Sequence, residues 1–387
     1  MKIIFANRSD CLSLVGGDTI QMLKTMEYLK KNYNYDIKIL LTPDEILRDN
    51  ESSIVHIFNI QTIDETLKFI EASKKAGKKV VLSTIYWDLS HCIYVYQLFK
   101  LFTKMNIINS LKNFRDIFIK LVSYRKFIPK YKNIDGFATK KLNEKIKAAL
   151  LEVDFILPNS DEELDILSKE FSIERNVMTK KSIIIPNAVD INQEKIIINN
   201  KNVKCSIANN IQDFVLEVGR IEVNKNQYGV VKALFDKPEI PIVFIGRVSD
   251  NKVDRKYYSK LKEISDRRGN VFFINQIPQE EVFEYYKKAR VHVLPSFRES
   301  PGLSSLEALY FGCEIVTSSS EFCPIEYYRF DRKAHICDPY NFKSIKKAIL
   351  EAYNNPKNNN FDNEYFKFYS YDNVSFIMNQ VYKKLIK

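Results

Sequence analysis

Two glutamates, Glu299 and Glu307, stand eight positions apart in the stretch FRESPGLSSLEAL. The apolar segment ARVHVLPS (289–296) predicts a strand just before them, and a helix is expected to begin near Leu303. The unpaired N–H groups of a first helical turn suit a phosphate. Carboxylates accept charge-assisted hydrogen bonds, so Glu299 can bind sugar hydroxyls and Glu307 the vicinal hydroxyls of a ribose. The plain alternatives are a solvated loop charge for Glu299 and stabilisation of the helix dipole by Glu307.

Two cations follow another predicted strand, in the stretch EVGRIEVNKNQ (217–227). Arg220 and Lys225 would project at the carboxyl edge of a sheet, where they suit a diphosphate, because arginine can hold two oxygens at once. An ordinary exposed loop with two charges is the alternative. Gly16 and Gly17 lie in the first strand-to-helix connection and let backbone approach an anion closely. They do not form the dinucleotide fingerprint G-x-G-x-x-G, so a plain turn is equally open.

These residues sit at the ends of predicted strands that alternate with helices along the chain. Near-continuous apolar runs between helical patterns indicate parallel sheets covered on both faces. The runs are KIIFANR, YDIKILLT, SIVHIFNI, KKVVLSTIY, VDFILPNS and SIIIPNAVD, then FVLEVGR, IPIVFIGR, NVFFINQI, ARVHVLPS, CEIVTSS and AHICDP. The pattern predicts an α/β protein of two doubly wound, Rossmann-like domains, over 1–195 and 205–365, that face an inter-domain cleft. A last helix within 366–387 packs on its own domain or crosses back to the first.

Several stretches carry a resemblance to a known family. The two-glutamate stretch resembles the Glu-x7-Glu motif of retaining GT-B glycosyltransferases, especially family 4 (group 1), and LEVGRIEVNKNQ resembles that family's arginine–lysine strand end. ILPNSDEELDIL and IIIPNAVD are similar to its stretches near the domain junction, and Gly16 and Gly17 to its glycine-rich first loop. These elements occur in the family's order and cover most of the chain. The resemblance therefore favours the diphosphate role for Arg220 and Lys225.

The resemblance implies a role for each position. Arg220 and Lys225 would neutralise the diphosphate of a nucleotide-sugar donor, which is also the leaving group. Glu299 would hold donor-sugar hydroxyls, and Glu307 would hold the ribose. Further donor contacts would come from Gly16, Gly17, Ile277, Gly302, Leu303 and Ser304. No cofactor and no metal is implied, because two cations and a helix N-terminus can stabilise the leaving charge instead. The donor nucleotide stays open among UDP, GDP and TDP.

One position departs from the family pattern. Many members carry a histidine after the fourth strand, facing the sugar, where the stretch LSTIYWDLSH places Tyr86. Asp88 and His91 lie just beyond and are the other candidates for the reacting face, with a surface histidine as the plain alternative for His91. As the family implies, the leaving phosphate itself would serve as the base toward the acceptor hydroxyl.

The net charge of +11 is concentrated in one segment. Residues 97–147 hold thirteen Lys and Arg against three Asp and Glu. Apolar residues keep helical spacing there, at Leu98, Leu101 and Met105, which predicts a basic amphipathic insertion able to lie on an anionic membrane. Helices that cap the first domain with solvated lysines are equally open. No helix-turn-helix, zinc or RNA-binding motif supports nucleic acid as a partner.

The favoured function is that of a retaining, metal-independent hexosyltransferase. It would move a sugar from a nucleotide diphosphate sugar to a saccharide or lipid-linked acceptor in the synthesis of a bacterial surface polysaccharide, lipopolysaccharide or glycan. Scattered cysteines without C-x-x-C spacing, and no signal peptide or membrane-spanning run, predict a cytoplasmic protein, peripheral on the membrane's inner face if the insertion binds lipid. The alternatives are a nucleotide-sugar epimerase and a non-catalytic sugar- or membrane-binding scaffold of the same fold.

Overall fold

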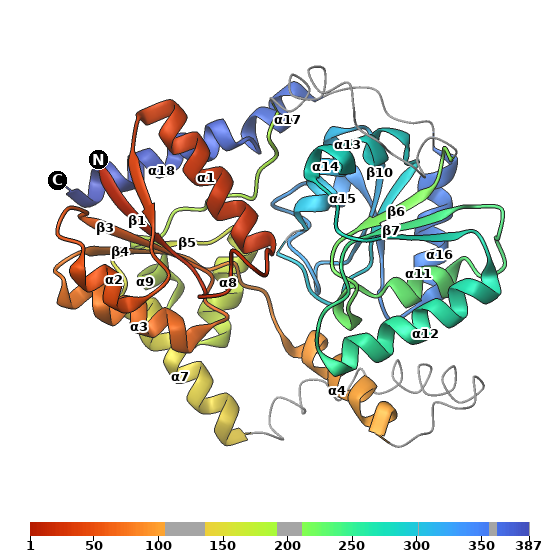
Figure 1. Cartoon of the computed structure of the whole chain (residues 1–387), viewed down its shortest axis with the longest axis horizontal. Coiled ribbons are helices and arrows are strands. Elements are labelled where there is room, and N and C mark those ends of the chain that lie inside the picture. The colour runs from red at the N-terminus through yellow and green to blue at the C-terminus, as the bar shows by residue number, and fades with distance from the viewer. Residues whose placement is uncertain (105–135, 192–210, 301, 356–361, 387) are drawn as a thin grey trace. The chain divides into compact units, whose positions relative to one another are not determined.

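The structure is a computed structural model that describes all residues except 105–135, 192–210, 301, 356–361 and 387. The chain divides into two compact units, each built on one parallel sheet (Figure 1). The first unit comprises Met1–Trp87, Asp135–Ile191 and Asp362–Lys387, and the second comprises Asp88–Ile134 and Asn192–Phe361. Each unit is described below by itself.

The sheet of the first unit has five parallel strands in the order β2-β1-β3-β4-β5. The strands are β1 (Lys2–Ala6), β2 (Asp36–Ile39), β3 (Ile54–Phe58), β4 (Lys79–Ser83) and β5 (Phe155–Leu157). The helices are α1 (Gly17–Tyr33), α2 (Pro43–Arg48), α3 (Ile63–Lys75), α7 (Gly136–Glu152), α8 (Asp161–Glu170), α9 (Arg175–Lys180), α17 (Asn363–Phe368) and α18 (Tyr371–Ile386). The strand order reverses between β1 and β3. The carboxyl ends of those two strands therefore form the switch point of this unit, where such sheets bind ligands.

The C-terminal helix α18 packs on α1 of the first unit, from which it is separated by most of the chain (Figure 1). The Tyr35 hydroxyl donates to Asn379 Oδ1 at 2.6 Å. His56, in the middle of β3, lies 2.6 Å from the Tyr382 hydroxyl through Nδ1 and 2.9 Å from Ser83 Oγ through Nε2. Val374, Met378 and Val381 of α18 join the same buried cluster as the apolar side chains of β1 and β3. The helix therefore completes the core of the first unit.

The sheet of the second unit has six parallel strands in the order β11-β10-β9-β6-β7-β8. The strands are β6 (Val215–Val218), β7 (Ile242–Ile245), β8 (Val271–Ile274), β9 (Val291–Leu294), β10 (Glu314–Ser318) and β11 (Ala334–Cys337). The helices are α4 (Ser90–Lys104), η3 (Val223–Lys225), α11 (Gln227–Ala233), α12 (Lys252–Arg268), α13 (Gln279–Lys288), α14 (Leu303–Tyr310), α15 (Phe330–Lys333) and α16 (Phe342–Asn354). Two apolar clusters bury opposite faces of the sheet, which explains the near-continuous hydrophobic strands. The order reverses between β6 and β9, which form this unit's switch point.

Helix α4 corrects the predicted domain boundary. The sequence placed residues 1–195 in one domain, but Asp88–Lys104 belongs to the second unit. The helix packs on η3 and α12, and Tyr94, Val95 and Phe99 are buried in the second unit's core. Helical spacing shows that a segment has an apolar face, but it does not show which surface that face covers.

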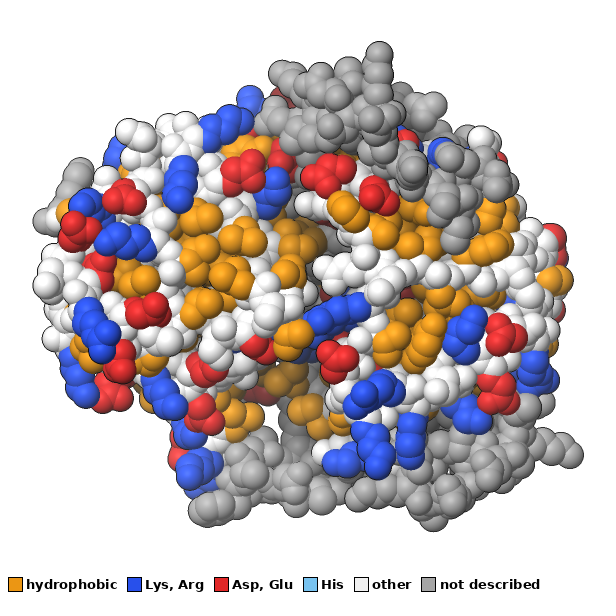
Figure 2. Space-filling model, in the orientation of Figure 1, with side chains coloured by type: hydrophobic (Ala, Val, Ile, Leu, Met, Phe, Trp, Pro, Cys, Tyr) orange, Lys and Arg blue, Asp and Glu red, His pale blue; other side chains and the backbone are white. Residues whose placement is uncertain are grey.

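Residues 105–135, which are most of the basic insertion, lie outside the described residues, while its two ends are helical in α4 and α7. On the face in Figure 2, Lys and Arg side chains are interspersed with Asp and Glu over the described parts of both units. Among the described residues, no helix has the length and hydropathy needed to span a bilayer.

Candidate functional site

Two of the predicted residues meet at the switch point of the second unit. Lys225 ends η3, which follows β6, and Glu299 lies in the loop after β9. Lys225 Nζ and Glu299 Oε1 form an ion pair, and only 17% and 9% of the two side chains are exposed. The backbone N–H of Phe297 donates to the carbonyl of Asn224 at 2.9 Å and joins the two loops. A shielded lysine beside a carboxylate can hold a ligand that carries both an anionic group and hydroxyls.

Arg220 follows β6, at a point where the backbone of Gly219 lies against Gly246 of the neighbouring strand end. A Cβ atom on Gly246, after β7, would lie 2.0 Å from the carbonyl oxygen of Gly219, so the two strand ends approach more closely than any side chain allows. The Arg220 side chain is 51% exposed and its Nε lies 3.4 Å from Glu222 Oε2. An exposed guanidinium with one distant carboxylate can turn toward an anion at little cost.

Glu307 lies on α14, one turn from its start, and is partly buried. Its Oε1 accepts a hydrogen bond of 2.6 Å from the Gln279 amide, and its Oε2 accepts one of 3.2 Å from the Tyr286 hydroxyl. Ile277 precedes α13 and packs, partly exposed, on the same apolar cluster as Tyr286. Two neutral donors thus orient the carboxylate, and a carboxylate has the capacity to accept more than two hydrogen bonds.

The start of α14 brings backbone close to Glu299. Gly302 is the N-cap residue, and a Cβ there would lie 2.3 Å from Leu294 Cδ2 and 3.5 Å from Glu299 Oε2. Leu303 and Ser304 form the first turn and are both partly exposed. The first-turn N–H groups therefore belong to the same neighbourhood as the Lys225–Glu299 pair, and glycine at 302 is what permits the approach.

Two buried titratable side chains lie in the strands of this unit. Glu217 on β6 is 1% exposed, and neither carboxyl oxygen has a hydrogen bond of acceptable geometry among the described residues. Burial raises its pKa well above 4.5, against the opposing charge of Lys225. His292 on β9 is fully buried, and desolvation lowers its pKa to about 3. His292 is therefore neutral at neutral pH, and Glu217 keeps its proton to a higher pH than an exposed glutamate does.

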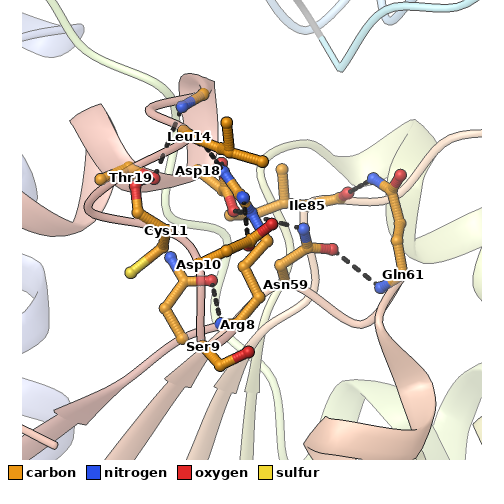
Figure 3. Close-up of polar contacts among 12 residues, drawn as sticks. Arg8, Ser9, Asp10, Cys11, Leu14, Asp18, Thr19, Asn59, Gln61 and Ile85 are labelled. Carbon is orange, nitrogen blue, oxygen red and sulfur yellow. Dashed lines mark hydrogen bonds and ion pairs between the residues drawn. The ribbon is translucent and has the colours of Figure 1, made fainter. Parts of the chain in front are cut away.

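In the first unit, Gly16 caps α1 and Gly17 begins it. A polar cluster that includes Arg8, Asp18 and Asn59 lies at the switch point of this unit (Figure 3). Arg8 follows β1, and its Nε donates to Asp18 Oδ2 at 3.0 Å. The Asn59 amide, after β3, donates to the same Asp18 oxygen at 3.4 Å. A Cβ on Gly16 would lie 2.7 Å from Asp18 Oδ1, so glycine lets the carboxylate turn toward Arg8.

Sequence reasoning missed Arg8, Asp18 and Asn59, although each lies at a strand end or in the first turn of α1. Position at a strand end was the signal that could have found Arg8 and Asn59. A fourth missed residue is Glu163 of α8, which is fully buried. It accepts hydrogen bonds from the Thr84 hydroxyl and, at 2.8 Å, from the backbone N–H of Tyr86. It fixes the loop after β4.

The three candidates for the reacting face have separate surroundings. Tyr86 belongs to the first unit, is 2% exposed and packs its ring edge-on against Phe171 at 5.5 Å. Asp88 begins the second unit and accepts a hydrogen bond of 2.7 Å from the backbone N–H of Ser90 at the start of α4. His91 is 7% exposed within the second unit, so the plain alternative of a surface histidine is wrong.

No three His, Cys, Asp or Glu side chains are grouped as metal ligands among the residues that the structure describes.

Comparison with known proteins defines the fold class, and most of the second unit matches a family model. Residues 200–367 match the family model for glycosyl transferases group 1. A stretch of 147 residues is 27% identical to O-antigen chain mannosyltransferase B of Escherichia coli, and it spans 36% of this chain and 37% of that protein. The chain thus matches just over a third of the length of this curated relative.

Solved structures match over the whole length. Sucrose-phosphate synthase from Thermosynechococcus elongatus superposes with a TM-score of 0.72 at 14% identity, over 100% of this chain and 99% of that one. The Anabaena protein HepE, in complex with UDP and glucose, gives a TM-score of 0.68 at 12% identity over 99% of both chains. The predicted fold class is confirmed: the chain has the GT-B fold, and its second unit carries the match to the group 1 glycosyltransferases.

Proposed function

We propose that this protein is a retaining glycosyltransferase that uses a nucleoside diphosphate sugar as donor. The observation that carries the proposal is the Lys225–Glu299 ion pair at the switch point of the second unit, with Arg220 and Glu307 on neighbouring elements. The match of residues 200–367 to the group 1 model supports the activity, and HepE, solved with UDP and glucose, supports the donor class.

Each residue has a task that its surroundings allow. Lys225 and Arg220 bind the diphosphate and stabilise the charge that grows on it as the glycosidic bond breaks. Glu299 receives sugar hydroxyls, and its pairing with Lys225 sets the sugar's position relative to the diphosphate. Glu307 accepts from the ribose hydroxyls, while Ile277 packs against the base. Gly302, Leu303 and Ser304 line the sugar and phosphate with backbone.

The leaving phosphate would take the proton of the acceptor hydroxyl on the same face as the departing sugar bond, so the anomeric configuration is retained. No metal enters this scheme, because the two cations and the first turn of α14 face the leaving group. The Gly16–Gly17 turn is proposed as a further contact for donor phosphate. The proposal assigns no contact with the reacting sugar to Tyr86, Asp88 or His91.

The acceptor is proposed to be a saccharide or a lipid-linked saccharide of a bacterial surface polysaccharide. The similarity to an O-antigen chain mannosyltransferase supports this choice. Residues 97–147 would bring the protein to the inner face of the cytoplasmic membrane by their positive charge. Charge reversal at Lys112, Arg115 and Lys120 should reduce co-sedimentation with anionic vesicles, and unchanged co-sedimentation would remove the membrane from the proposal.

The first experiment screens UDP, GDP and TDP and their sugars by calorimetry and by release of the diphosphate. Glu307→Ala should weaken binding of the preferred diphosphate about tenfold, because a charge-assisted hydrogen bond to ribose contributes roughly 1.5 kcal/mol or more. Glu239→Ala, at an exposed glutamate of the same unit, is the matched control and should bind as wild type.

The outcomes separate the alternatives. Binding of a nucleotide sugar without turnover would favour a non-catalytic scaffold, and interconversion of the sugar without transfer would favour an epimerase. Activity that disappears with a chelator and returns with a divalent cation would contradict the metal-free scheme. The anomeric configuration of the product, read by NMR, decides retention.

A further inference from the structure

Helix α4 comes from the first half of the sequence but contacts the elements that carry the proposed donor residues. It packs on η3, which ends in Lys225, and on α12 (Figure 1). Phe99 of α4 meets Tyr257 of α12 edge-on, with ring centroids 5.7 Å apart. The helix is therefore part of the packed second unit, and a shift of α4 would also move the η3 loop.

His91 in the first turn of α4 makes three directed contacts. Its Nδ1 lies 3.0 Å from the hydroxyl of Tyr340, and its Nε2 lies 2.9 Å from Glu321 Oε1. Its ring stands edge-on to Phe322, with ring centroids 4.7 Å apart. A buried imidazole with both nitrogens engaged has one orientation, so these contacts fix the three partners with respect to α4.

Those partners hold the segment that presents Glu299. The carbonyl oxygen of Phe322 accepts the backbone N–H of Glu299 at 2.8 Å. On the other side, the ring of Tyr340 packs on Phe297, two residues before Glu299, with ring centroids 4.8 Å apart. One histidine thus touches both supports of the Glu299 backbone.

We propose that His91 is a positioning residue for Glu299 and sets where the donor sugar is held. The inference rests on the proposed function for its catalytic meaning, since Glu299 is taken to bind the sugar hydroxyls. His91 itself touches neither donor nor acceptor in this scheme. It acts through Phe322 and Tyr340, and its location in α4 ties donor-sugar placement to a helix whose last residues begin the basic insertion.

If His91 only positions Glu299, its loss should affect turnover and nucleotide affinity differently. Nucleotide affinity depends on Glu307 and Ile277 and on the diphosphate contacts of Arg220 and Lys225. The partners of His91 are instead Glu321, Phe322 and Tyr340, so most of that affinity should survive loss of the imidazole. Turnover depends on the sugar being held in line with the diphosphate, and a small misplacement at a reacting centre is costly in rate. His91→Phe keeps an aromatic ring against Phe322 but removes both polar contacts. Tyr340→Phe removes only one hydroxyl.

The test compares full-length wild type with His91→Phe, Tyr340→Phe and the control His335→Phe, whose histidine is partly exposed and lies 3.3 Å from Glu314. Steady-state turnover is measured with the nucleotide sugar that wild type uses, and calorimetry follows the matching diphosphate alone. His91→Phe should lower kcat about tenfold and change diphosphate affinity less than twofold. Tyr340→Phe should show a smaller loss of the same kind, and His335→Phe should show none.

Amide hydrogen exchange gives a readout that does not depend on activity. The Glu299 amide, which is bonded to Phe322, should exchange about tenfold faster in His91→Phe, while amides in the second turn of α14 keep their wild-type rates. An unchanged Glu299 amide overturns the inference, even if the protein proves to have no transferase activity. Equal loss of diphosphate affinity and kcat also overturns it, because that result indicates a general disturbance of the unit. If wild type turns over no nucleotide sugar but exchange responds as expected, the proposed function fails and the positioning contact stands.

Discussion

Replacement of the buried Glu217 by glutamine should stabilise the second unit, and the gain should increase with pH. The carboxyl group is 1% exposed, and neither oxygen has a hydrogen bond of acceptable geometry in the described chain. Desolvation raises its pKa well above 4.5. The folded protein therefore keeps the proton on Glu217 in a range of pH where the unfolded chain has released it.

The size of the effect follows from proton linkage. Above pH 4.5 the folded state binds one more proton than the unfolded state, so the free energy of unfolding falls as pH rises toward the folded-state pKa of Glu217. The full slope is about 1.4 kcal/mol for each pH unit. Glutamine has a similar shape and is neutral in both states, so Glu217→Gln lacks this loss. Its advantage over wild type should therefore grow by about 1 kcal/mol between pH 5 and pH 6.

Urea unfolding of the full chain can measure this gain. The protein has one tryptophan, Trp87, which belongs to the first unit, so its fluorescence follows that unit, while circular dichroism follows both. The change expected for Glu217→Gln is in the dichroism transition and not in the fluorescence transition. Glu239→Gln, at an exposed site, is the matched control and should show no pH-dependent difference.

A difference between Glu217→Gln and wild type that stays constant from pH 5 to pH 7 would refute this reasoning. It would mean that Glu217 is ionised in the folded protein and that Lys225 supplies the compensating charge. Lys225 would then be shared between two carboxylates, and the substitution should instead weaken the second unit by removing one of them.

Two further substitutions test the strand ends and the buried histidine of the second unit. Gly246→Ala should lower diphosphate affinity at least tenfold in calorimetry, because its Cβ would lie 2.0 Å from the Gly219 carbonyl and must displace the Arg220 backbone. Gly269→Ala, where a Cβ meets nothing within 4 Å, controls for the strain of alanine at positive φ. Equal behaviour of the two variants would contradict the prediction. His292→Phe should make the dichroism transition less sensitive to acid, because the folded-state pKa of His292 is lowered to about 3. Wild type is therefore fully stabilised above pH 6.5, and its free energy of unfolding falls by about 1.4 kcal/mol per pH unit as the pH drops from there toward 3. A variant with the wild-type slope would argue against a neutral His292.

The parallel architecture and the proximity of two proposed donor residues could be predicted from the sequence because each depends on local patterns. Apolar runs between helical segments indicate buried parallel strands, and the carboxyl ends of such strands gather at one edge. Lys225 and Glu299 were named from strand ends 74 positions apart, and the structure joins them as an ion pair. One expected strand did not form: SIIIPNAVD makes only isolated bridges, at Ser182 and Val189, because Pro186 has no N–H to donate to a ladder.

The packing of α4 and the partners of His91 could not be predicted, because a sequence pattern does not show which surface a helix or side chain contacts. The apolar face of α4 could cover either unit, and only the structure shows Tyr94, Val95 and Phe99 in the core of the second. His91 was considered for the reacting face because of its distance from the fourth strand. Its actual surroundings, Tyr340 and Glu321, lie more than 200 positions away, and no spacing rule connects them.

The raised pKa of Glu217 and the exposure of Arg220 both bear on how the proposed site, which has several carboxylates, would bind a diphosphate. Lys225 is paired with Glu299, and Arg220 lies near Glu222, so two cations already have two anions beside them. A third carboxylate at Glu217 would leave the group net negative and would oppose a phosphate at the short distances of a binding site. Because burial raises the pKa of Glu217, its carboxyl group ionises less readily than an exposed glutamate and adds less negative charge to this group. The first-turn N–H groups of α14, which attract negative charge, can then make the site favourable for a phosphate.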